Sequence, residues 1–446
     1  MSAQSEHAVR ITVRDDLRRS RLTVFFRLLL AIPHFVWLLL WSIAAFLAAI
    51  LNWFVTLVRG TPQAGLHGFL AAYVRYDTHL FAYLTLAANP YPGFTGEQGT
   101  YPVDVWIPGP ERQSRWTVAF RLVLALPAIV IVALLGPSPG VFGGDPDAED
   151  VVLAFVPGGL LGFPAFLAWF ASLVLGRAPH GLRNFEVWGV RYNAEVASYM
   201  FLLTARYPNT DTVLPADAGA PPEKPIRLRV EDDLRRSRLT VFFRLLLALP
   251  HFVWLWLWSY AALVAVFLSW LVALVLGRVP APLHRFLAAF VRYGTHVYAY
   301  VFLAANPFPG FTGTAGTYPV DLEIDGPAPQ RRLVTLFRLV LAIPAVLLQW
   351  ALLVLAFVAA FFGWFASLVT GRMPGGLRNV VAWYLRYSSQ TTGYFFLVTG
   401  RYPYSGPPVE EPEPEPEVEA PEPEPEVEGP PEPGPEAEPE TRAFGP

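Results

Sequence analysis

Eight arginines recur at fixed places in this chain and are its best candidates for binding chemistry. Four follow a phenylalanine at the start of an apolar run: Arg27, Arg121, Arg244 and Arg338. Four more precede a tyrosine further along: Arg75-Tyr76, Arg191-Tyr192, Arg292-Tyr293 and Arg386-Tyr387. A guanidinium group presents five N–H donors in a planar fork that fits phosphate or carboxylate. An arginine among apolar residues requires such a partner or water.

Each set allows two interpretations. The Phe-Arg arginines could hold anionic lipid head groups, or they could extend their charged ends to water and anchor the helix ends. We favour anchoring for this set. The Arg-Tyr pairs recur although the next residue varies, from Asp77 and Asn193 to Gly294 and Ser388. For these pairs, lipid phosphate and a carboxylate inside the protein fit equally well.

The histidines give weaker signals. His34 corresponds to His251, His67 to His284 and His79 to His296. Paired histidines suggest a metal site or a proton relay, but neither i, i+4 spacing nor a nearby carboxylate cluster accompanies them. The acidic stretch 145–150 resembles a calcium loop in composition only. With no glycine-rich phosphate loop, nucleophile elbow or zinc-protease pair, the sequence predicts a non-enzyme without metal or cofactor.

The elements that position these residues come from repetition. The run Phe26–Pro33 returns at Phe120–Pro127, Phe243–Pro250 and Phe337–Pro344. We infer two long repeats, 9–208 and 226–403. Each contains two modules, at about 9–108 and 109–208, then about 226–325 and 326–403. The connection 209–225 is expected to be a solvated linker, and 404–446 a disordered Pro/Glu-rich acidic tail.

Each module opens with a long apolar run, such as 24–58, which predicts insertion in a membrane. A single helix of this length would measure about 52 Å, against a hydrocarbon core of about 30 Å. We therefore expect two short helices in a hairpin. A single helix that bends near Pro33, with an interfacial first arm, is the competing interpretation. The acidic insertion within 136–157 is expected to lie in water.

The last third of each module predicts an amphipathic helix, as over 66–88, with Gly68, Ala71, Arg75 and His79 on one face. Such a helix could lie at the membrane interface, the interpretation that we favour, or pack its small, polar face inside a bundle. Short alternating stretches at 9–13, 101–107, 226–230 and 318–324 predict strands. The expected fold is an all-α integral membrane protein of four hairpin-plus-amphipathic-helix modules, with minor strands at the module ends.

Charge divides the chain in two. Residues 408–446 hold 14 Glu and one Arg, while the rest holds 32 of the 33 basic and 22 of the 36 acidic residues. Basic residues precede every apolar run, which predicts that all four starts face the cytoplasm. We expect a multi-pass protein with both termini cytoplasmic. No cleaved signal peptide is apparent at the N-terminus, and the absence of Cys excludes disulfides.

The module resembles the bacterial DUF4389 membrane family. The resemblance rests on Ser20–His34, on the Gly277-Arg278-Val279-Pro280 turn, on the Arg-Tyr pairs, and on closing motifs such as Arg206-Tyr207-Pro208 and Asn306–Pro309. It covers nearly all of residues 9–403. What it implies is a small bacterial membrane domain of unknown function, often in tandem. It implies no catalytic residues.

Together these features predict a non-enzymatic scaffold in the bacterial plasma membrane. Its partners would be the lipid bilayer, with anionic lipids among them, and a basic protein bound by the tail, but no nucleic acid. The alternative is a small-solute transporter or channel with an arginine-lined site, because duplicated halves with broken helices are typical of that class. The biochemical activity, substrate and oligomeric state cannot be read from these residues.

Overall fold

The computed structural model describes residues 7–136, 159–410, 434 and 445. The first repeat begins with strand β1 (Arg10–Val13) and three helices, α1 (Arg21–Phe25), α2 (Arg27–Leu30) and α3 (Ile32–Arg59). Helix α4 (Ala64–Leu84) and strand β2 (Val103–Trp106) complete module one. Module two contains α5 (Arg115–Ala119), α6 (Arg121–Leu135), α7 (Gly162–Leu175) and α8 (His180–Met200).

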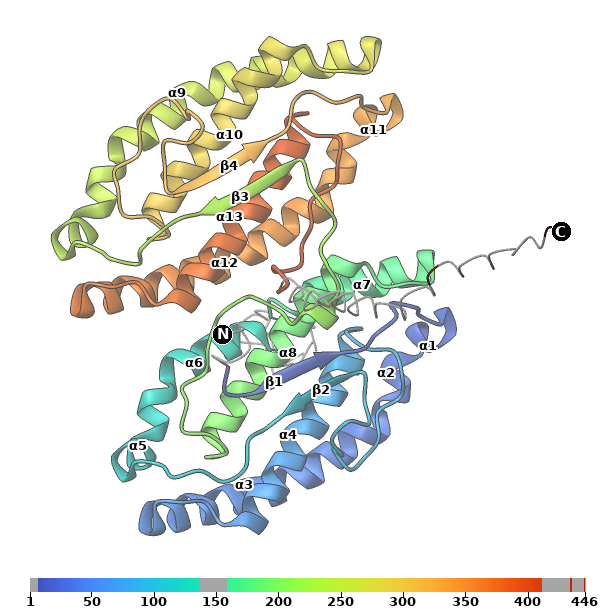
Figure 1. The fold of residues 1–446 in the computed structure, drawn as a ribbon, viewed down its shortest axis with the longest axis vertical. Coiled ribbons are helices and arrows are strands. Elements are labelled where there is room, and N and C mark those ends of the chain that lie inside the picture. The colour runs from blue at the N-terminus through green and yellow to red at the C-terminus, as the bar shows by residue number, and fades with distance from the viewer. Residues whose placement is uncertain (1–6, 137–158, 411–433, 435–444, 446) are drawn as a thin grey trace, which may run out of the picture. The chain divides into compact units, whose positions relative to one another are not determined.

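A short 3-10 helix, η2 (Ala216–Ala218), leads to the second repeat. Module three contains β3 (Ile226–Val230), α9 (Arg238–Leu276), α10 (Ala281–Val301) and β4 (Val320–Ile324). Module four contains α11 (Arg332–Leu336), α12 (Arg338–Thr370) and α13 (Gly375–Phe395). Figure 1 shows each pair of strands lying across the middle of its repeat, in front of the helices.

The predicted helical hairpins are wrong in modules one, three and four; in module two the segment between α6 and α7 lies outside the described residues. Helix α9 runs unbroken for 39 residues and α12 for 33, with Pro250 and Pro344 inside them. In module one the chain bends at Phe26 and Ala31 and then continues as the 28-residue α3. No run of polar or turn-forming residues interrupts these apolar segments, so nothing favours a reversal. The competing interpretation is confirmed in having one long helix, but the helix does not break at the proline: the bends of module one lie at Phe26 and Ala31, and α9 and α12 continue through Pro250 and Pro344. The acidic insertion lies outside the described residues.

The four 21-residue helices α4, α8, α10 and α13 form the interior of the described unit. Helix α4 packs between α3 and α8, and α10 packs between α9 and α13. In α8 the glutamates, the central arginines and the aromatics are all buried. Of the two interpretations of these amphipathic helices, packing inside a bundle describes this arrangement.

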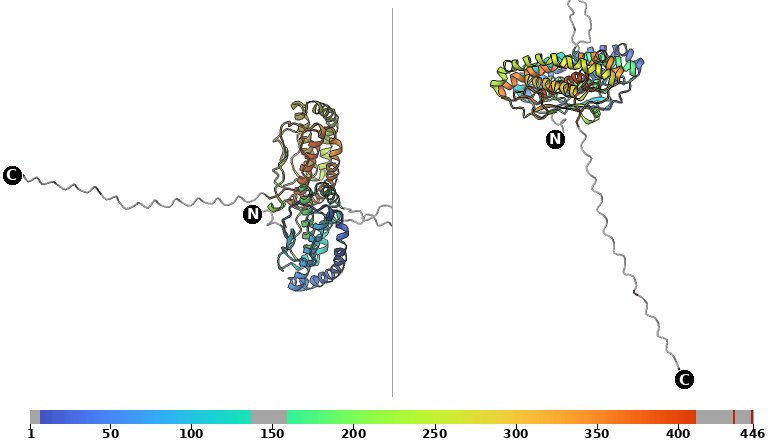
Figure 2. Two further views of the ribbon diagram at one scale, coloured as in Figure 1. Left: turned by 90° about the vertical axis from the view of Figure 1, so that its right-hand side faces the viewer. Right: turned by 90° about the horizontal axis from the view of Figure 1, so that it is seen from above.

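All four predicted strands are present. β1 pairs antiparallel with β2, with Ile11 opposite Val105, and β3 pairs with β4, with Leu228 opposite Leu322. Each sheet therefore joins the start and the end of one module. The strands lie on the opposite side from the long helices (Figure 2), so we call this the sheet side.

The connection between the repeats is not solvated as expected. Thr210, Asp211, Thr212, Leu214 and Ala218 are buried. Asn379 on α13 donates to the Asp211 carboxylate at 2.7 Å, and the backbone of Leu214 pairs with that of Glu410 and Pro408. The linker residues fill space between α8 and α13, because Asp and Thr there find internal hydrogen-bond partners.

Candidate functional site

The Phe-Arg arginines are internal. Arg27, Arg121, Arg244 and Arg338 are each at most 3% exposed. Arg244 donates to the carbonyls of Tyr300 and Ala305 at 2.5 and 2.9 Å, and Arg338 donates to those of Tyr394 and Thr399 at the same distances. Arg27 makes the equivalent bonds to Tyr83 and Ala88. Arg121 donates to the equivalent carbonyl of Thr204 and to the Gln113 side chain, as Arg338 does to Gln330.

These arginines therefore satisfy the C-terminal carbonyls of the amphipathic helices, where a cation also interacts favourably with the helix dipole. Each guanidinium also lies over a tyrosine ring, from 4.0 Å for Arg121 over Tyr199 to 4.6 Å for Arg338 over Tyr394. Neither interpretation from sequence anticipated a carbonyl partner. With these internal bonds and so little exposure, binding of lipid by this set stays a prediction without support from the geometry.

The tyrosine and the arginine of each Arg-Tyr pair bind different parts of the protein. The tyrosines contact the neighbouring helices. Tyr76 and Tyr293 hydrogen-bond to His34 and His251 at 2.8 and 2.7 Å, which fixes α4 to α3 and α10 to α9. Tyr387 instead donates to the Ala345 carbonyl at 3.3 Å, and Tyr192 is buried beside Trp188. Each tyrosine of the pair is thus part of the helix packing rather than an open binding site.

The arginines of the pairs bind the loops and strands of the sheet side. Arg75 donates to the Gly96 carbonyl at 2.9 Å, and Arg292 donates to the Leu322 carbonyl at 3.1 Å. Arg191 binds the carbonyls of Val213 and Asp211, and Arg386 that of Gly406. Arg292 also lies 3.4 Å from the Asp321 carboxylate. The internal carboxylate expected from sequence lies beside Arg292, whereas the bonds of Arg75, Arg191 and Arg386 described above go to backbone carbonyls.

Four residues after each of these arginines stands a second buried polar group. His79 lies 2.7 Å from Asp104, and His296 lies 2.8 Å from Asp321. In module two the position holds Glu195, which pairs with His7 at 2.7 Å. In module four it holds Gln390, which donates to the Ile226 carbonyl at 2.9 Å. Each module therefore binds its central helix to the sheet or the preceding loop, with different chemistry at one position.

The carboxylates near the histidines were missed from sequence. Asp104 and Asp321 each follow a valine within a predicted strand, 25 residues after the histidine. Both repeats share this spacing, which was the available signal. Within residues 7–136 and 159–410, no three His, Asp or Glu side chains gather to hold a metal ion.

The largest exposed feature is the apolar surface of the long helices, which we call the apolar face. It is formed by the outward residues of α1–α3, α5–α7, α9, α11 and α12. On α9, Leu245, Leu263 and Val275 are 67–70% exposed. Three helices are long and apolar enough to cross a membrane: Ile32–Arg59, Arg238–Leu276 and Arg338–Thr370. This surface is typical of contact with lipid rather than water.

The long helices of each repeat are antiparallel. Arg238, at the start of α9, donates to the Val369 carbonyl near the end of α12 at 2.9 Å. Arg332, at the start of α11, donates to the Val275 carbonyl near the end of α9 at 2.8 Å. The first repeat has the same reciprocal bonds, from Arg21 to Val174 and from Arg115 to Val58. The two ends of each repeat thus carry equivalent groups.

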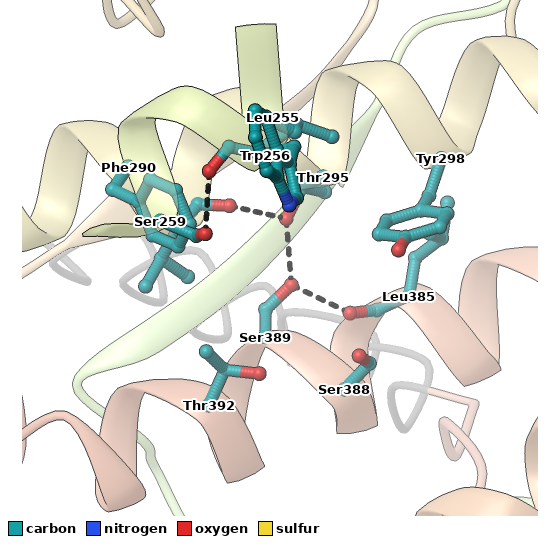
Figure 3. A pocket seen from close by; sticks show the side chains of 12 residues that line it. Leu255, Trp256, Ser259, Phe290, Thr295, Tyr298, Leu385, Ser388, Ser389 and Thr392 are labelled. Atoms are coloured by element: carbon teal, nitrogen blue, oxygen red, sulfur yellow. Dashed lines mark hydrogen bonds between the residues drawn. The ribbon is translucent and has the colours of Figure 1, made fainter. Parts of the chain in front are cut away.

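A polar cavity of about 340 Å³ lies between α9, α10 and α13 (Figure 3). Hydroxyl-bearing residues line it from all three helices: Ser259, Thr295, Ser388, Ser389 and Thr392. Aromatic side chains of Trp256, Phe290 and Tyr298 form part of its wall. No lining residue carries a charge.

Comparison with known proteins bears on the whole arrangement. The family described as Domain of unknown function (DUF4389) matches residues 21–95, 151–210, 238–312 and 332–405. These four matches cover more than half of the chain. The chain belongs to this family. Each match contains an apolar helix followed by a central helix that carries an Arg-Tyr pair, and in the match at 151–210 the apolar helix is the 14-residue α7. No curated protein and no solved structure matches the chain, and the DUF4389 description itself assigns no activity.

Proposed function

We propose that this DUF4389 protein is a non-enzymatic scaffold of the bacterial plasma membrane whose long helices lie in one leaflet, parallel to the bilayer. The observation that carries the proposal is the position of the charged β3–β4 sheet, level with the middle of the apolar helix α9. This orientation replaces the multi-pass arrangement expected from sequence.

The level of the sheet follows from a chain of contacts. Trp258 stands at the midpoint of α9 and packs on Phe290 and Tyr293 of α10, with ring centroids 5.6 and 5.4 Å away. Arg292, between those two residues, binds Leu322 and Asp321 of β4. A residue one position along a helix lies about 100° further around it, so α10 connects the midpoint of α9 to β4.

The sheet carries charges that hydrocarbon would not accommodate. Arg227 pairs with Asp325 at 2.9 Å and Arg229 with Glu231 at 2.8 Å, and these side chains are 42–68% exposed. A sheet of two strands also has open edges, whose backbone groups need water. If α9 crossed the bilayer about its midpoint, this sheet would lie at the bilayer centre. With α9 parallel to the bilayer, the sheet faces water and the apolar face enters lipid.

Length and pairing favour the same orientation. A 39-residue helix measures about 58 Å, roughly twice the hydrocarbon core. Because the long helices are antiparallel, a spanning arrangement would place the basic starts of α9 and α11 on opposite sides. The parallel arrangement keeps all four basic starts at one surface, as the distribution of basic residues requires.

A scaffold also needs a way to reach partners. Residue Glu410 donates its backbone N–H to the Leu214 carbonyl, two residues before η2, and η2 lies against β1. The described unit therefore ends, at Glu410, on the sheet side. We take the tail, with its Pro-Glu repeats, to recruit a basic protein at the membrane surface.

A transporter is the second candidate, and the antiparallel helix pairs favour it. Inverted repeats related by an axis in the membrane plane are typical of transporters. That arrangement needs spanning helices, so the same measurement separates the two.

Single cysteines at Arg18, Arg112 and Glu323 test the orientation, because the natural chain has none. Arg18 lies just before α1 and Arg112 just before α5, which are at opposite ends of the long helices of the first repeat. Glu323 lies on β4 and reports on the sheet. In oriented inner-membrane vesicles, a membrane-impermeant maleimide should label all three from the cytoplasmic side only. Labelling of Arg18→Cys and Arg112→Cys from opposite sides would overturn the proposal and favour transport.

A further inference from the structure

We propose that the cavity between α9, α10 and α13 binds an uncharged lipid alcohol, with the hydroxyl group held by Thr295, Ser388 and Ser389. This inference rests on the proposed function, because the ligand would enter from the surrounding leaflet. The probe that represents this class is diacylglycerol, a lipid with one free hydroxyl group.

The cavity lies on the side of α10 that faces away from the sheet and is bordered by residues of α9. Gly294 in its wall comes two residues after Arg292, so it lies about 200° around α10 from the side that binds the sheet. Trp256 and Leu255 of α9 line the other side, and Trp256 is 59% exposed on the apolar face. A molecule that lies in the bilayer therefore has access to the hydroxyl groups without crossing the sheet side.

The hydrogen-bond pattern selects a donor. Ser389 donates its single proton to the Leu385 carbonyl at 2.6 Å, and Ser259 donates to the Trp256 carbonyl at 2.6 Å. Thr295 lies 3.0 Å from the Val291 carbonyl and 2.9 Å from Ser389, so its proton is used as well. Each hydroxyl oxygen has two lone pairs. Ser259, Thr295 and Ser389 thus offer acceptor lone pairs to a ligand, and Ser388, which accepts a hydrogen bond from Gln349 at 3.0 Å, keeps a second lone pair. A ligand hydroxyl group can donate to these oxygens, whereas an ester has no proton to donate.

Charge excludes the commonest lipids. No acidic or basic side chain lines the cavity, so a phosphate group would enter a poorly hydrated site without a counter-charge, at a high desolvation cost. An alcohol head group has no such cost, and its chains can follow the aromatic wall and the apolar surface of α9.

Comparison with the first repeat explains why the second repeat has this cavity. Asp77 stands where the second repeat has Gly294, and it accepts a hydrogen bond from Asn193 at 3.3 Å. An added Cβ at Gly294 would meet nothing within 4 Å. The absence of a side chain at Gly294 therefore leaves room that the first repeat fills with a carboxylate and an amide.

The experiment uses the full chain in phosphatidylglycerol–phosphatidylethanolamine vesicles that contain a diacylglycerol with a photoreactive group in one chain. Flotation reports membrane binding in the same sample, and peptide mapping reports the labelled site. We expect labelling of α9, α10 and α13 that unlabelled dioleoylglycerol displaces. Its 3-acetyl ester, which lacks the donor, should compete about fivefold less well, the factor that one net hydrogen bond provides.

Variants locate the site. Gly294→Leu fills the cavity with an uncharged side chain and should abolish this labelling, whereas Gly68→Leu adds the same side chain where a Cβ also meets nothing and should leave it unchanged. Ser388→Ala with Ser389→Ala should remove the preference over the acetyl ester, with folding checked by circular dichroism.

Three outcomes would refute one or both proposals. A protein that floats but is labelled equally by an acyl-chain phosphatidylcholine probe refutes the lipid alcohol and leaves the scaffold intact. Equal competition by the acetyl ester also refutes it. A protein that does not float refutes the proposed function, and this inference with it.

Discussion

The Nε2 atom of His79 on α4 lies 2.7 Å from the Asp104 carboxylate of β2, and His296 repeats this contact with Asp321 at 2.8 Å. Gly99 and Val105 donate backbone N–H bonds to the same carboxylate. A single aspartate thus connects the sheet, a tight loop and the central helix. The position of the central helix α4 therefore depends on a carboxylate that lies outside this helix.

Acid should weaken this connection. Burial acts to raise the pKa of Asp104, but the hydrogen bonds from His79, Gly99 and Val105 outweigh it, so the pKa lies below its ordinary value of 3.8. The folded protein then binds fewer protons than the unfolded chain. The stabilisation is fully present above about pH 4 and is lost as the pH falls through the lower folded pKa.

Asp104→Asn and Asp321→Asn should each lower the free energy of unfolding by about 2 kcal/mol at pH 7, as expected for hydrogen bonds to a charged group. The double variant should also lose the part of the acid dependence below about pH 4 that these two aspartates contribute. Denaturant unfolding in a mild detergent, followed by tryptophan fluorescence, measures both. An acid dependence that is unchanged in the double variant would contradict the assignment.

Buried guanidinium groups should not be replaceable by lysine. Arg244→Lys keeps the charge but cannot reach the carbonyls of Tyr300 and Ala305 with two donors, and we expect a loss of about 3 kcal/mol. The exposed Arg112→Lys is the matched control and should change the stability by less than about 0.5 kcal/mol. Thermal unfolding of both variants measures the two losses of stability. Equal losses would contradict the role of Arg244 in capping the end of α10.

The Arg-Tyr arginines should matter little for membrane binding. A scaffold predicts that Arg75→Lys and Arg292→Lys float with vesicles within about twofold of the natural chain, since one partly exposed hydrogen bond contributes about 0.5–1.5 kcal/mol to the fold. A transporter predicts that the same variants stay folded but lose solute flux. Flotation and vesicle uptake, measured on one preparation, give opposite answers for the two functions.

The histidine–tyrosine contacts allow a comparison between modules. Tyr76→Phe leaves the buried His34 side chain without its partner and should cost about 1–3 kcal/mol. Tyr387→Phe removes a longer bond to a backbone carbonyl at 3.3 Å and should cost about 1 kcal/mol or less. If the two variants unfold at the same denaturant concentration, the hydrogen bond between Tyr76 and His34 contributes no more stability than the bond from Tyr387 to the Ala345 carbonyl.

The apolar face can be tested directly. Leu263→Glu and Phe267→Glu place a carboxylate on the exposed side of α9 without touching the packed side, and each should reduce flotation by at least tenfold, because a charge in the hydrocarbon region costs about 2–3 kcal/mol. Arg229→Glu, on the sheet side, should float normally on neutral vesicles. Reduced flotation of the Arg229 variant alone would indicate that the sheet, rather than the apolar face, contacts lipid.

The sequence by itself determined the family, the repetition and the four strands. Periodicity identifies these features because each depends on residues close together in the chain, such as the alternation in 226–230 or the uninterrupted apolar run 238–276. The sequence also excluded disulfides. It did not determine whether an apolar run folds back on itself, because the free energy of a hairpin and that of a bent helix differ mainly through their tertiary contacts.

Only the tertiary structure decided which groups meet. Arg27 reaches the end of a helix 56 residues away, and His79 meets an aspartate 25 residues later. The contacts depend on how α3, α4 and β2 pack, and no local pattern encodes that distance. The proposed orientation toward the membrane also rests on tertiary structure. Hydropathy counts the apolar residues of α9, whereas the proposal that this helix lies along the bilayer depends on the position of β4 beside the midpoint of α9.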